Sequence, residues 1–388
     1  MRGRKQFWKG ALCGALLTCI VGIGLLYTFM GVDDILNRET EQKLRIMRQL
    51  IDSKYLYGDA ISDEDLQEAL MKGYVNGLGD PYSVYYDKEE TQALMESTSG
   101  EFVGIGVVLS KEMETNTYTF TTIYEDSPAQ KAGAKEGDVL YAVDGEPVAK
   151  LDMDSIVLRI KGEKGTKVLL TVLRDGKEKT LEAVRDKVVV KTVSYEMKPN
   201  QIGYLYVSGF EEVTYQQFEN AITALKKQGM KALVIDLRNN PGGNFDTVCD
   251  MLDYILPEGV IISTKDKNGK GQVVKSDAEH ALKLPLAVLV NGNSASASEV
   301  FSGAVQDYGI GTIIGTTTYG KGIVQELYQL PDGTCLKITT SEYYTPNGRS
   351  IHGVGIQPDI EVEYVYDETN PERDNQLQKA LEVLAKEI

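Results

Sequence analysis

Apolar side chains recur every three or four positions among charged ones between residues 35 and 95. Leu44, Met47 and Leu50 begin the series, and Tyr74 lies near its end. This spacing places the apolar groups on one face of a helix. Turn-forming residues at 77–81 interrupt the pattern. We therefore expect an N-terminal helical region over residues 33–98, which packs on the main body or dimerises beside it.

A different pattern, short β-type runs, fills residues 99–185. Asp144-Gly145 and Asp175-Gly176 are hairpin-type turns. The pattern predicts a compact β-rich module with two short helices, at 128–133 and 153–160. The expected strands are 102–109, 118–123, 139–143, 167–173 and 179–183.

Strands and helices alternate beyond residue 186. The strands expected at 202–207, 232–237 and 286–290 are separated by helices at 215–228 and 245–256. Such alternation is typical of an α/β fold, in which functional loops follow the carboxyl ends of the strands. We expect an α/β core over 186–367 and a final helix within 368–388, and a homodimer could form through the N- and C-terminal helices.

The N-terminus combines a short basic segment, residues 1–9, with an uncharged run from 10 to 32. About 20 apolar residues suffice to cross a bilayer. Basic residues before the run predict that the N-terminus stays in the cytoplasm. We expect a single-pass anchor in the cell membrane with the rest of the chain extracytoplasmic. A cleaved signal peptide is the alternative.

Charge and cysteine content limit the possible partners. The formal charge of −16 and the pI near 4.8 argue against nucleic acid as a partner. Four scattered cysteines show no metal-binding spacing, so we expect no metal and no cofactor. Cys249 and Cys335 could form a disulfide or remain two buried thiols.

One glycine-containing segment could support chemistry on an anion. Gly242-Gly243 directly follows an expected strand and precedes a helix, where backbone N–H groups can face an anion. A dinucleotide-binding loop would need the G-x-G-x-x-G pattern, which does not follow this strand. The loop therefore suits an oxyanion better than a nucleotide.

Three serines, Ser294, Ser296 and Ser298, lie between an apolar run and an expected helix. A serine at a helix start can be a nucleophile or only a helix cap. Lys321 lies between two glycines, either in a surface turn or buried. Burial would lower the pKa of its amine and make it a base, which Gln325 could orient.

Residues 99–185 resemble a PDZ domain. Gly104-Ile105-Gly106 could present N–H groups to a terminal carboxylate, although a lone GxG is also typical of a β-bulge. The segment Gly137–Gly145, with its G-D-V-L and V-D-G elements, makes the likeness specific.

Three further segments resemble the carboxyl-terminal processing proteases, the S41 family of Ser–Lys peptidases: 236–243, 291–299 and 315–325. The resemblance covers nearly the whole chain after residue 33 and implies a crotonase-like ββα spiral core. It implies that Ser296 is the nucleophile, Lys321 the general base and Gln325 its support. The oxyanion hole would be formed by the N–H groups of Gly243 and Ala297, with Gly242 as the alternative to Gly243.

The resemblance also implies how substrates are selected. The PDZ domain would bind the apolar C-termini of protein substrates and control access to the protease. Lys161 matches a family position whose basic residue contacts the catalytic apparatus in the active state, although arginine is often found there. A solvated charge is the other interpretation of Lys161.

Other functions compete with the Ser–Lys protease. His352 or His280 could belong to a histidine triad, although neither neighbourhood carries a family role. An inactive PDZ scaffold or chaperone of the cell envelope is the main alternative, and a ligand-binding homologue of the same fold is another. Neither would need Ser296, Lys321 and Gln325 together.

Overall fold

A computed structural model describes residues 37–112, 115–277, 279–370 and 373–388. The chain divides into two units, Met1–Gly73 and Tyr74–Ile388. The anchor expected over 10–32 lies outside the described residues. Within the described ranges, no helix is both long enough and apolar enough to cross a bilayer.

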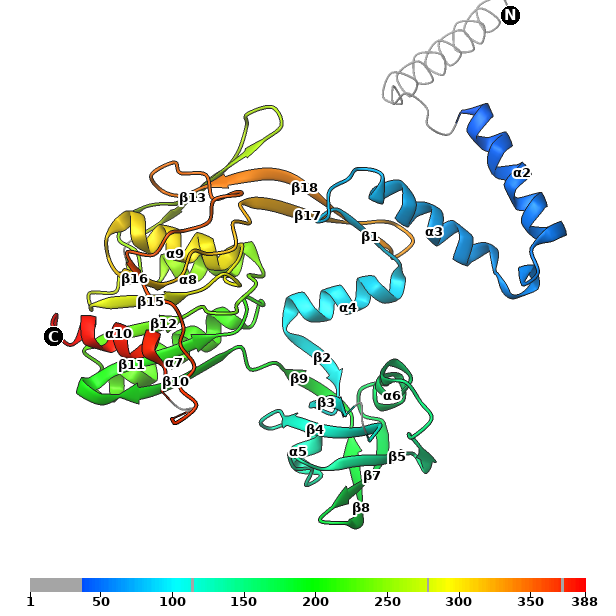
Figure 1. Ribbon diagram of the computed structural model, residues 1–388, viewed down its shortest axis with the longest axis horizontal. Helices are drawn as coiled ribbons and strands as arrows, with labels where there is room; N and C mark the ends of the chain where they lie inside the picture. Colours follow the sequence, from blue (N-terminus) through cyan, green and yellow to red (C-terminus); the bar gives the residue numbers. More distant parts are fainter. Residues whose placement is uncertain (1–36, 113–114, 278, 371–372) are drawn as a thin grey trace, which may run out of the picture. The chain divides into compact units, whose positions relative to one another are not determined.

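The described part of the first unit, from residue 37 on, is helical (Figure 1). Its elements are α2 (Arg38–Lys54), the 3₁₀ turn η1 (Gly58–Ala60) and α3 (Asp63–Asn76), the last of which continues into the second unit. Helix α2 begins where the Asn37 side chain accepts a hydrogen bond from the N–H of Thr40. It buries none of its own residues, and Ile46, Met47 and Leu50 are each more than half exposed.

The PDZ-like module is a five-strand sheet, β3-β4-β5-β7-β8, with the short β6 paired to β5. Tyr118, Phe120 and Ile156 are fully buried in its core. The expected strand 102–109 is two strands, because Ile105–Gly106 interrupts it and Gly106 has a positive φ. The elements are β2 (Glu101–Gly104), β3 (Val107–Glu112), β4 (Thr117–Ile123), α5 (Pro128–Lys131), β5 (Val139–Val143), β6 (Glu146–Pro147), α6 (Met153–Ile160), β7 (Lys167–Arg174), β8 (Lys177–Val184) and β9 (Asp186–Val189), which pairs with β2.

The core is built on a second sheet in the order β10-β11-β12-β15-β16-β19. Leu233 and Ile235 of β12 pack with α7, α8 and α9, whereas Ala232 and Val234 pack with α10 on the other face (Figure 1). The period of two along the strand explains this division. The elements are β10 (Val193–Lys198), η2 (Pro199–Gln201), β11 (Ile202–Val207), α7 (Thr214–Lys227), β12 (Ala232–Asp236), α8 (Phe245–Asp253), β15 (Leu286–Val290), α9 (Ala297–Tyr308), β16 (Thr312–Gly315), β19 (Ile360–Glu361) and α10 (Asn375–Leu384).

A third sheet provides residues that border the candidate site. Its order is β1-β18-β13-β14, with β17 also paired to β18. Strand β1 (Val84–Tyr86) falls within the region expected to be helical and pairs antiparallel with β18. The helix α4 (Lys88–Ser99) follows, capped by Asp87. The other strands are β13 (Gly259–Asp266), β14 (Val273–Ser276), β17 (Ile323–Gln329) and β18 (Cys335–Tyr344).

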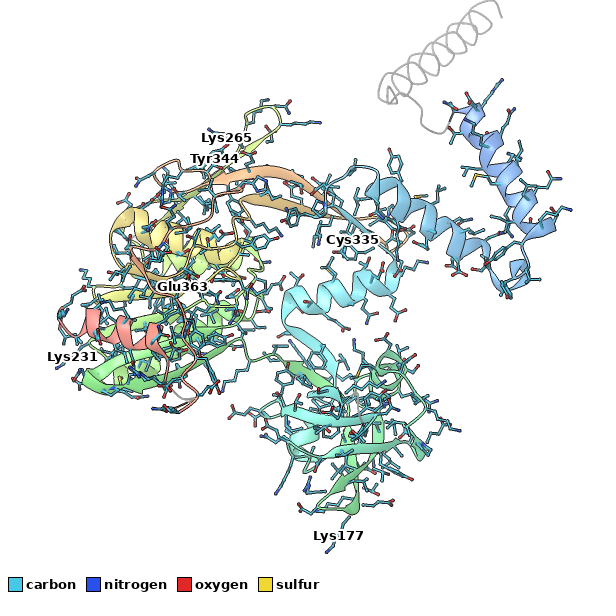
Figure 2. All side chains as sticks on the ribbon, viewed as in Figure 1. Lys177, Lys231, Lys265, Cys335, Tyr344 and Glu363 are labelled. Atoms are coloured by element: carbon cyan, nitrogen blue, oxygen red, sulfur yellow. The ribbon has the colours of Figure 1, made fainter. Side chains whose placement is uncertain are left out.

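The two described cysteines outside the N-terminal run are free and buried. Cys249 lies in α8. Cys335 begins β18 and is labelled in Figure 2. Burial raises the pKa of the Cys249 thiol to about 12, so this thiol is uncharged at neutral pH. Both side chains therefore behave as small apolar groups.

Arg238 fastens the C-terminal helix to the sheet. Its guanidinium donates to both carboxylate oxygens of Asp236, at the end of β12, and of Asp374, the N-cap of α10. It also donates to Gln376 at 3.0 Å. Burial would raise the pKa of Asp374, but hydrogen bonds from Arg238 outweigh burial and hold that pKa below its usual value.

Replacing Asp374 with Ala removes the cap and one partner of Arg238. We expect the free energy of unfolding at pH 7 to fall by about 1–3 kcal/mol, measured by urea denaturation. Because the Asp374 pKa is depressed in the folded chain, its contribution is present above pH ~4 and is lost as the pH falls through the folded value. The difference between the two proteins should therefore shrink at low pH. A difference that persists undiminished at pH 2 would contradict this account.

Candidate active site

Two loops meet where parallel strands β12 and β15 end side by side. The first loop carries Gly242 and Gly243, and the second carries the three serines. Asn240 joins them: its carbonyl accepts from the Ala295 N–H at 3.1 Å and from the Ser298 hydroxyl at 2.9 Å. Adjacent carboxyl ends of parallel strands thus build the site from distant segments.

Ser296 occupies a conformation that few residues adopt. It lies immediately before α9, with a φ of +54°. A non-glycine residue with this φ is strained by about 1–3 kcal/mol and persists only when its surroundings hold it. Its backbone N–H donates to Glu299 at 2.8 Å. The side chain lines a cavity of about 490 Å³.

The other two serines are fully buried and committed to the backbone. Ser294 donates to the Leu237 carbonyl at 2.8 Å, and Ser298 donates to the Asn240 carbonyl at 2.9 Å. Neither lines the cavity. Of the three serines, only Ser296 presents its hydroxyl to this space.

Gly243 and Ala297 border the same cavity. Among the hydrogen bonds of the described residues, neither of their backbone N–H groups has an acceptor. The Gly242 N–H, in contrast, donates to the Asn240 side chain at 2.9 Å. The geometry therefore favours Gly243 over Gly242 as an anion donor. A Cβ at Gly243 would lie 2.4 Å from the Phe210 carbonyl oxygen, which explains why glycine is needed there.

Glu299 connects the serine segment to the lysine segment. Its carboxylate is completely buried and accepts four hydrogen bonds. One oxygen accepts from the N–H groups of Ser296 and Lys321, both at 2.8 Å. The other accepts from the Gly320 N–H at 2.7 Å and the Thr318 hydroxyl at 2.5 Å. A buried carboxylate is stable only with such partners.

Lys321 lies partly buried on the cavity wall. Burial and the nearby Lys337 lower the pKa of its amine, while Asp80 and Glu299 oppose that shift. The net direction is downward, which increases the fraction of neutral amine at a given pH. Its Nζ atom lies 4.5 Å from the centre of the Tyr82 ring.

Tyr343 touches both candidate residues and was not anticipated from the sequence. Its hydroxyl lies 2.7 Å from the Lys321 carbonyl oxygen and 3.2 Å from Ser296 Oγ. Burial raises the pKa of Tyr343, so the phenol stays protonated. A tyrosine in an alternating strand carries no sequence signal of this role, which arises from the pairing of β18 beside the loop at 321.

Gln325 lines the cavity, but its contacts are with the sheet. It lies in strand β17 rather than in a helix or tight turn. Its side-chain amide donates to the Thr339 hydroxyl at 3.4 Å and the Ile323 carbonyl at 3.3 Å. Its expected hydrogen bond to the Lys321 amine is not among those of the described residues.

The PDZ-like module carries a second cavity, of about 400 Å³. Gly104, Ile105 and Gly106 line it, together with apolar residues of β3 and α6. The Ile105 side chain itself is buried in the module. Lys161 lies at the end of α6, and its amine pairs with Glu96 of α4 at 2.9 Å. It does not line the cavity that holds Ser296.

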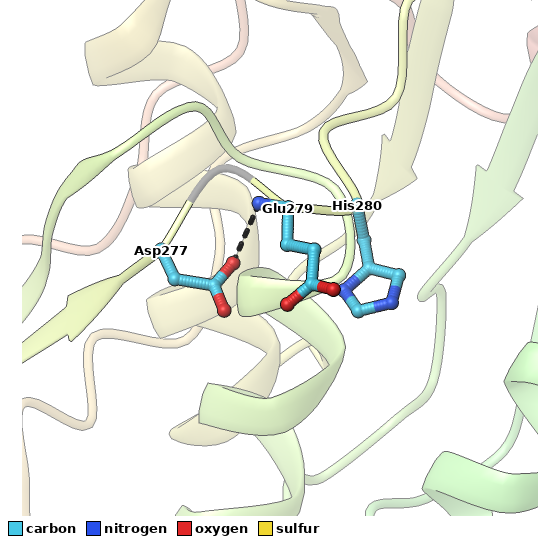
Figure 3. Close-up of side chains that lie close together, drawn as sticks. All are labelled: Asp277, Glu279 and His280. Carbon is cyan, nitrogen blue, oxygen red and sulfur yellow. Dashed lines mark hydrogen bonds between the residues drawn. The ribbon is translucent and has the colours of Figure 1, made fainter.

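The histidines lie elsewhere. Both His280 and His352 are exposed, and neither lines the Ser296 cavity. His280 belongs, with Asp277 and Glu279, to the one group in the described part of the chain whose side chains could surround a metal ion (Figure 3). All three are exposed, and Asp277 already accepts from the Glu279 N–H at 2.7 Å. Exposed acidic groups of this kind are common without a metal.

The chain resembles known proteins along most of its length. The profile of peptidase family S41 matches residues 201–362, and that of the PDZ domain matches 119–174. A CtpA-like serine protease of Staphylococcus saprophyticus is 36% identical over 355 residues, covering 91% of this chain and 71% of the relative. One from Staphylococcus aureus is 35% identical, covering 93% and 73%.

A solved structure supports the fold. A protein from Bacteroides fragilis whose structure is described as an S41 protease superposes with a TM-score of 0.52, covering 83% of this chain and 90% of its own. Its sequence is 17% identical, so the likeness concerns the fold alone.

Replacing Glu299 with Gln tests the connection between the two segments. Gln supplies one acceptor and turns an NH₂ group toward N–H donors, so some of the four bonds must be lost. We expect the free energy of unfolding to fall by about 2–4 kcal/mol, measured by urea denaturation. The exposed Glu326→Gln on β17 is the matched control and should change it by less than about 0.5 kcal/mol. Equal stability of both variants would refute the structural role of Glu299.

Proposed function

The chain belongs to peptidase family S41, as a CtpA-like serine protease with a PDZ domain, and from that premise we propose its mechanism, substrates and location. We propose an endopeptidase that uses Ser296 and Lys321, anchored in the cell membrane with its catalytic part outside the cytoplasm. One observation supports the mechanism above others. Ser296 and Lys321 line the same cavity as Gly243 and Ala297, whose N–H groups have no acceptor among the hydrogen bonds of the described residues.

In the proposed acylation step, Ser296 Oγ attacks a peptide carbonyl carbon while the neutral Lys321 amine accepts the hydroxyl proton. The negative charge that develops on the carbonyl oxygen is stabilised by the N–H groups of Gly243 and Ala297. The ammonium of Lys321 then returns the proton to the leaving amine, and the C–N bond breaks. The products are an acyl-enzyme ester and a free amine.

Deacylation repeats the chemistry with water. The neutral amine takes a proton from water, the hydroxide oxygen attacks the ester carbon, and the same N–H groups stabilise the oxyanion. Lys321 then protonates Ser296 as the ester bond breaks. Donors of this kind are worth about 10²–10³ in rate because they are already aimed at the developing charge.

The second cavity supports recognition of C-terminal tails. Gly104, Ile105 and Gly106 line it, and Val107, Leu109 and Val157 provide apolar lining. A carboxylate can bind a concave set of N–H groups while an extended peptide adds to the edge of β3. We propose that apolar C-termini bind here. Lys161 would act as a sensor: when a peptide is bound, its amine would leave Glu96 and contact the catalytic apparatus.

Membrane anchoring and orientation rest on the basic segment 1–9 and the uncharged run 10–32. The core sheet, with α7, α8 and α9 on one face, is consistent with the crotonase-like ββα spiral that we propose for the core. A homodimer is also proposed. Ile46, Met47 and Leu50 of α2 form an exposed apolar face that a second copy could cover. Helix α10, in contrast, already packs Ala380 and Leu384 into the hydrophobic core of the same chain.

Ser296→Ala and Lys321→Ala should each reduce peptide cleavage by at least about 10³-fold, because each removes a reacting group. Cleavage of an unstructured protein substrate, followed by mass spectrometry, measures the loss. Ser302→Ala, in the same helix but away from the cavity, is the control and should remain active. Circular dichroism should show all three variants folded. Undiminished turnover in either of the first two would refute the Ser–Lys mechanism.

Carboxylate recognition is tested with two peptides that differ only in a free or amidated apolar C-terminus. We expect the free acid to be cleaved about tenfold or more faster, with the difference largely in KM, because a charge-assisted hydrogen bond is lost in the amide. Val157→Asp, which places a charge in the apolar wall, should weaken cleavage of the free acid. Equal cleavage of both peptides would refute recognition through residues 104–106.

A further inference from the structure

Lys321 is held by groups other than its proposed partner. Its amine faces the Tyr82 ring at 4.5 Å, and Asp80 acts on it electrostatically. In the described part of the chain no hydrogen bond joins Lys321 Nζ to Ser296 Oγ. Lys321 also lines a third cavity, of about 440 Å³, whose walls include Tyr82 and Tyr319. Lys321 thus borders both the Ser296 cavity and the cavity beside Tyr82.

The turn Asp80–Ser83 is built rigidly. Asp80 accepts hydrogen bonds from the Tyr82 N–H at 3.0 Å, the Ser83 hydroxyl at 2.6 Å and the Thr339 hydroxyl at 2.7 Å. Ser83 in turn accepts from the Thr339 N–H at 3.1 Å. The pairing of β1 with β18 continues this attachment. The turn is therefore fixed to the strand that also carries Tyr343.

Both neighbours of the amine favour its charged form. Burial would raise the pKa of Asp80, but hydrogen bonds from Ser83 and Thr339 hold it below the usual value, so Asp80 is an anion at neutral pH. A hydrogen bond with Tyr319 raises the pKa of Tyr82, so its ring is that of a neutral phenol. The face of such a ring attracts a cation but not a neutral amine.

The remaining charged and titratable groups around the amine come from three other elements. Glu299 of α9 favours the cation, and Lys337 of β18 disfavours it. Tyr319 lies on the segment before Lys321, and Tyr343 of β18 stays neutral. The turn supplies the aromatic ring that faces the amine, that of Tyr82, and one of the two carboxylates that favour its cation, that of Asp80.

Ser296 is likewise engaged elsewhere. Its Oγ lies 3.2 Å from the Tyr343 hydroxyl, which also lies 2.7 Å from the Lys321 carbonyl oxygen. Because the tyrosine has one proton and the carbonyl is closer, the serine can donate its own proton to the phenol oxygen. Each member of the dyad thus has a tyrosine partner in this state.

We propose that the turn Asp80–Ser83 positions Lys321: the Tyr82 ring and the Asp80 carboxylate hold its amine as a cation, away from Ser296, in a resting state of the protease. Tyr82 is a positioning residue that acts through Lys321. The proposal rests on the proposed role of Lys321 as general base. Activation requires the amine to leave the ring, lose its proton and approach Ser296.

Gln325 gives the turn a connection to the cavity. Its side chain donates to the Thr339 hydroxyl, which in turn donates to Asp80. Gln325 and Thr339 are directly paired across β17 and β18. A substrate that contacts Gln325 in the cavity therefore acts on the hydrogen bonds of the turn. Gln325 therefore connects the cavity to the turn through Thr339.

The test compares Tyr82→Leu, which removes the ring, with Tyr82→Phe, which keeps it. The full chain is assayed for kcat/KM against pH with one peptide substrate. We expect Tyr82→Leu to move the acid limb down by about 0.5–1 pH unit, a threefold to tenfold gain in kcat/KM on that limb. Tyr82→Phe should keep the native acid limb. Asp80→Asn, which removes the charge at nearly constant size, should move it in the same direction as Tyr82→Leu.

Direct titration of the Lys321 side chain by NMR gives a readout besides activity, and its midpoint should fall in both Tyr82→Leu and Asp80→Asn. Tyr328→Leu, an exposed tyrosine of β17 that lines neither cavity, controls for loss of a ring. An unchanged acid limb and an unchanged lysine midpoint in folded Tyr82→Leu would overturn the proposal, as would Tyr82→Phe behaving like Tyr82→Leu. If instead Lys321→Ala cleaves normally, the Ser–Lys mechanism itself is wrong.

Discussion

The buried carboxylate of Glu299 is the interaction on which the site depends. It joins the N–H of Ser296, at the start of α9, to the N–H groups of Gly320 and Lys321, more than twenty residues later in the chain. A carboxylate without solvent is costly unless hydrogen bonds replace its hydration. Its position is therefore as firmly determined as that of the loops it connects, and the two candidate catalytic residues share one anchor.

The hydrogen bonds of Glu299 explain how the strained backbone at Ser296 is tolerated. Ser296 has a left-handed φ, and Gly243 sits so close to Phe210 that no side chain fits. Asn240 also holds the two loops together. Its carbonyl accepts from the Ser298 hydroxyl, and its side chain accepts from the Gly242 N–H and donates to the Val207 carbonyl. Strained backbone of this kind exposes the serine hydroxyl and leaves N–H groups unpaired, as an oxyanion site requires. The rest of the core sheet supplies the rigidity.

Two tyrosines contact the same residues. Tyr343 bridges the Lys321 backbone and Ser296, and Tyr82 faces the lysine amine. Burial lowers the pKa of Lys321 while the Asp80 turn opposes the change. The pKa of Lys321 is thus set by burial and Lys337, which lower it, and by Asp80 and Glu299, which oppose them. Small movements of a short turn can shift that balance because electrostatic interactions are strong where water is scarce.

Periodicity and composition, read from the sequence alone, determined much of the fold. The amphipathic repeat predicted the N-terminal helices, and the alternation after residue 186 predicted the α/β core, because burial imposes these periods locally. Motif resemblance pointed to the S41 family, to the PDZ domain and to Ser296 and Lys321. The short strand β1 and the break within 102–109 were not anticipated, since pairing with β18 and the conformation of Gly106 decide them.

Only the tertiary structure decided which chemical groups are free and which are occupied. The sequence offers three serines and two adjacent glycines as near equivalents, and the structure commits Ser294, Ser298 and the Gly242 N–H to buried partners. Glu299, Tyr343 and the Asp80 turn carry no local signal of their roles, and Gln325 contacts Thr339 instead of the lysine amine. The reason is physical: hydrogen bonds between segments far apart in the chain depend on where the strands and loops meet, which no local pattern encodes.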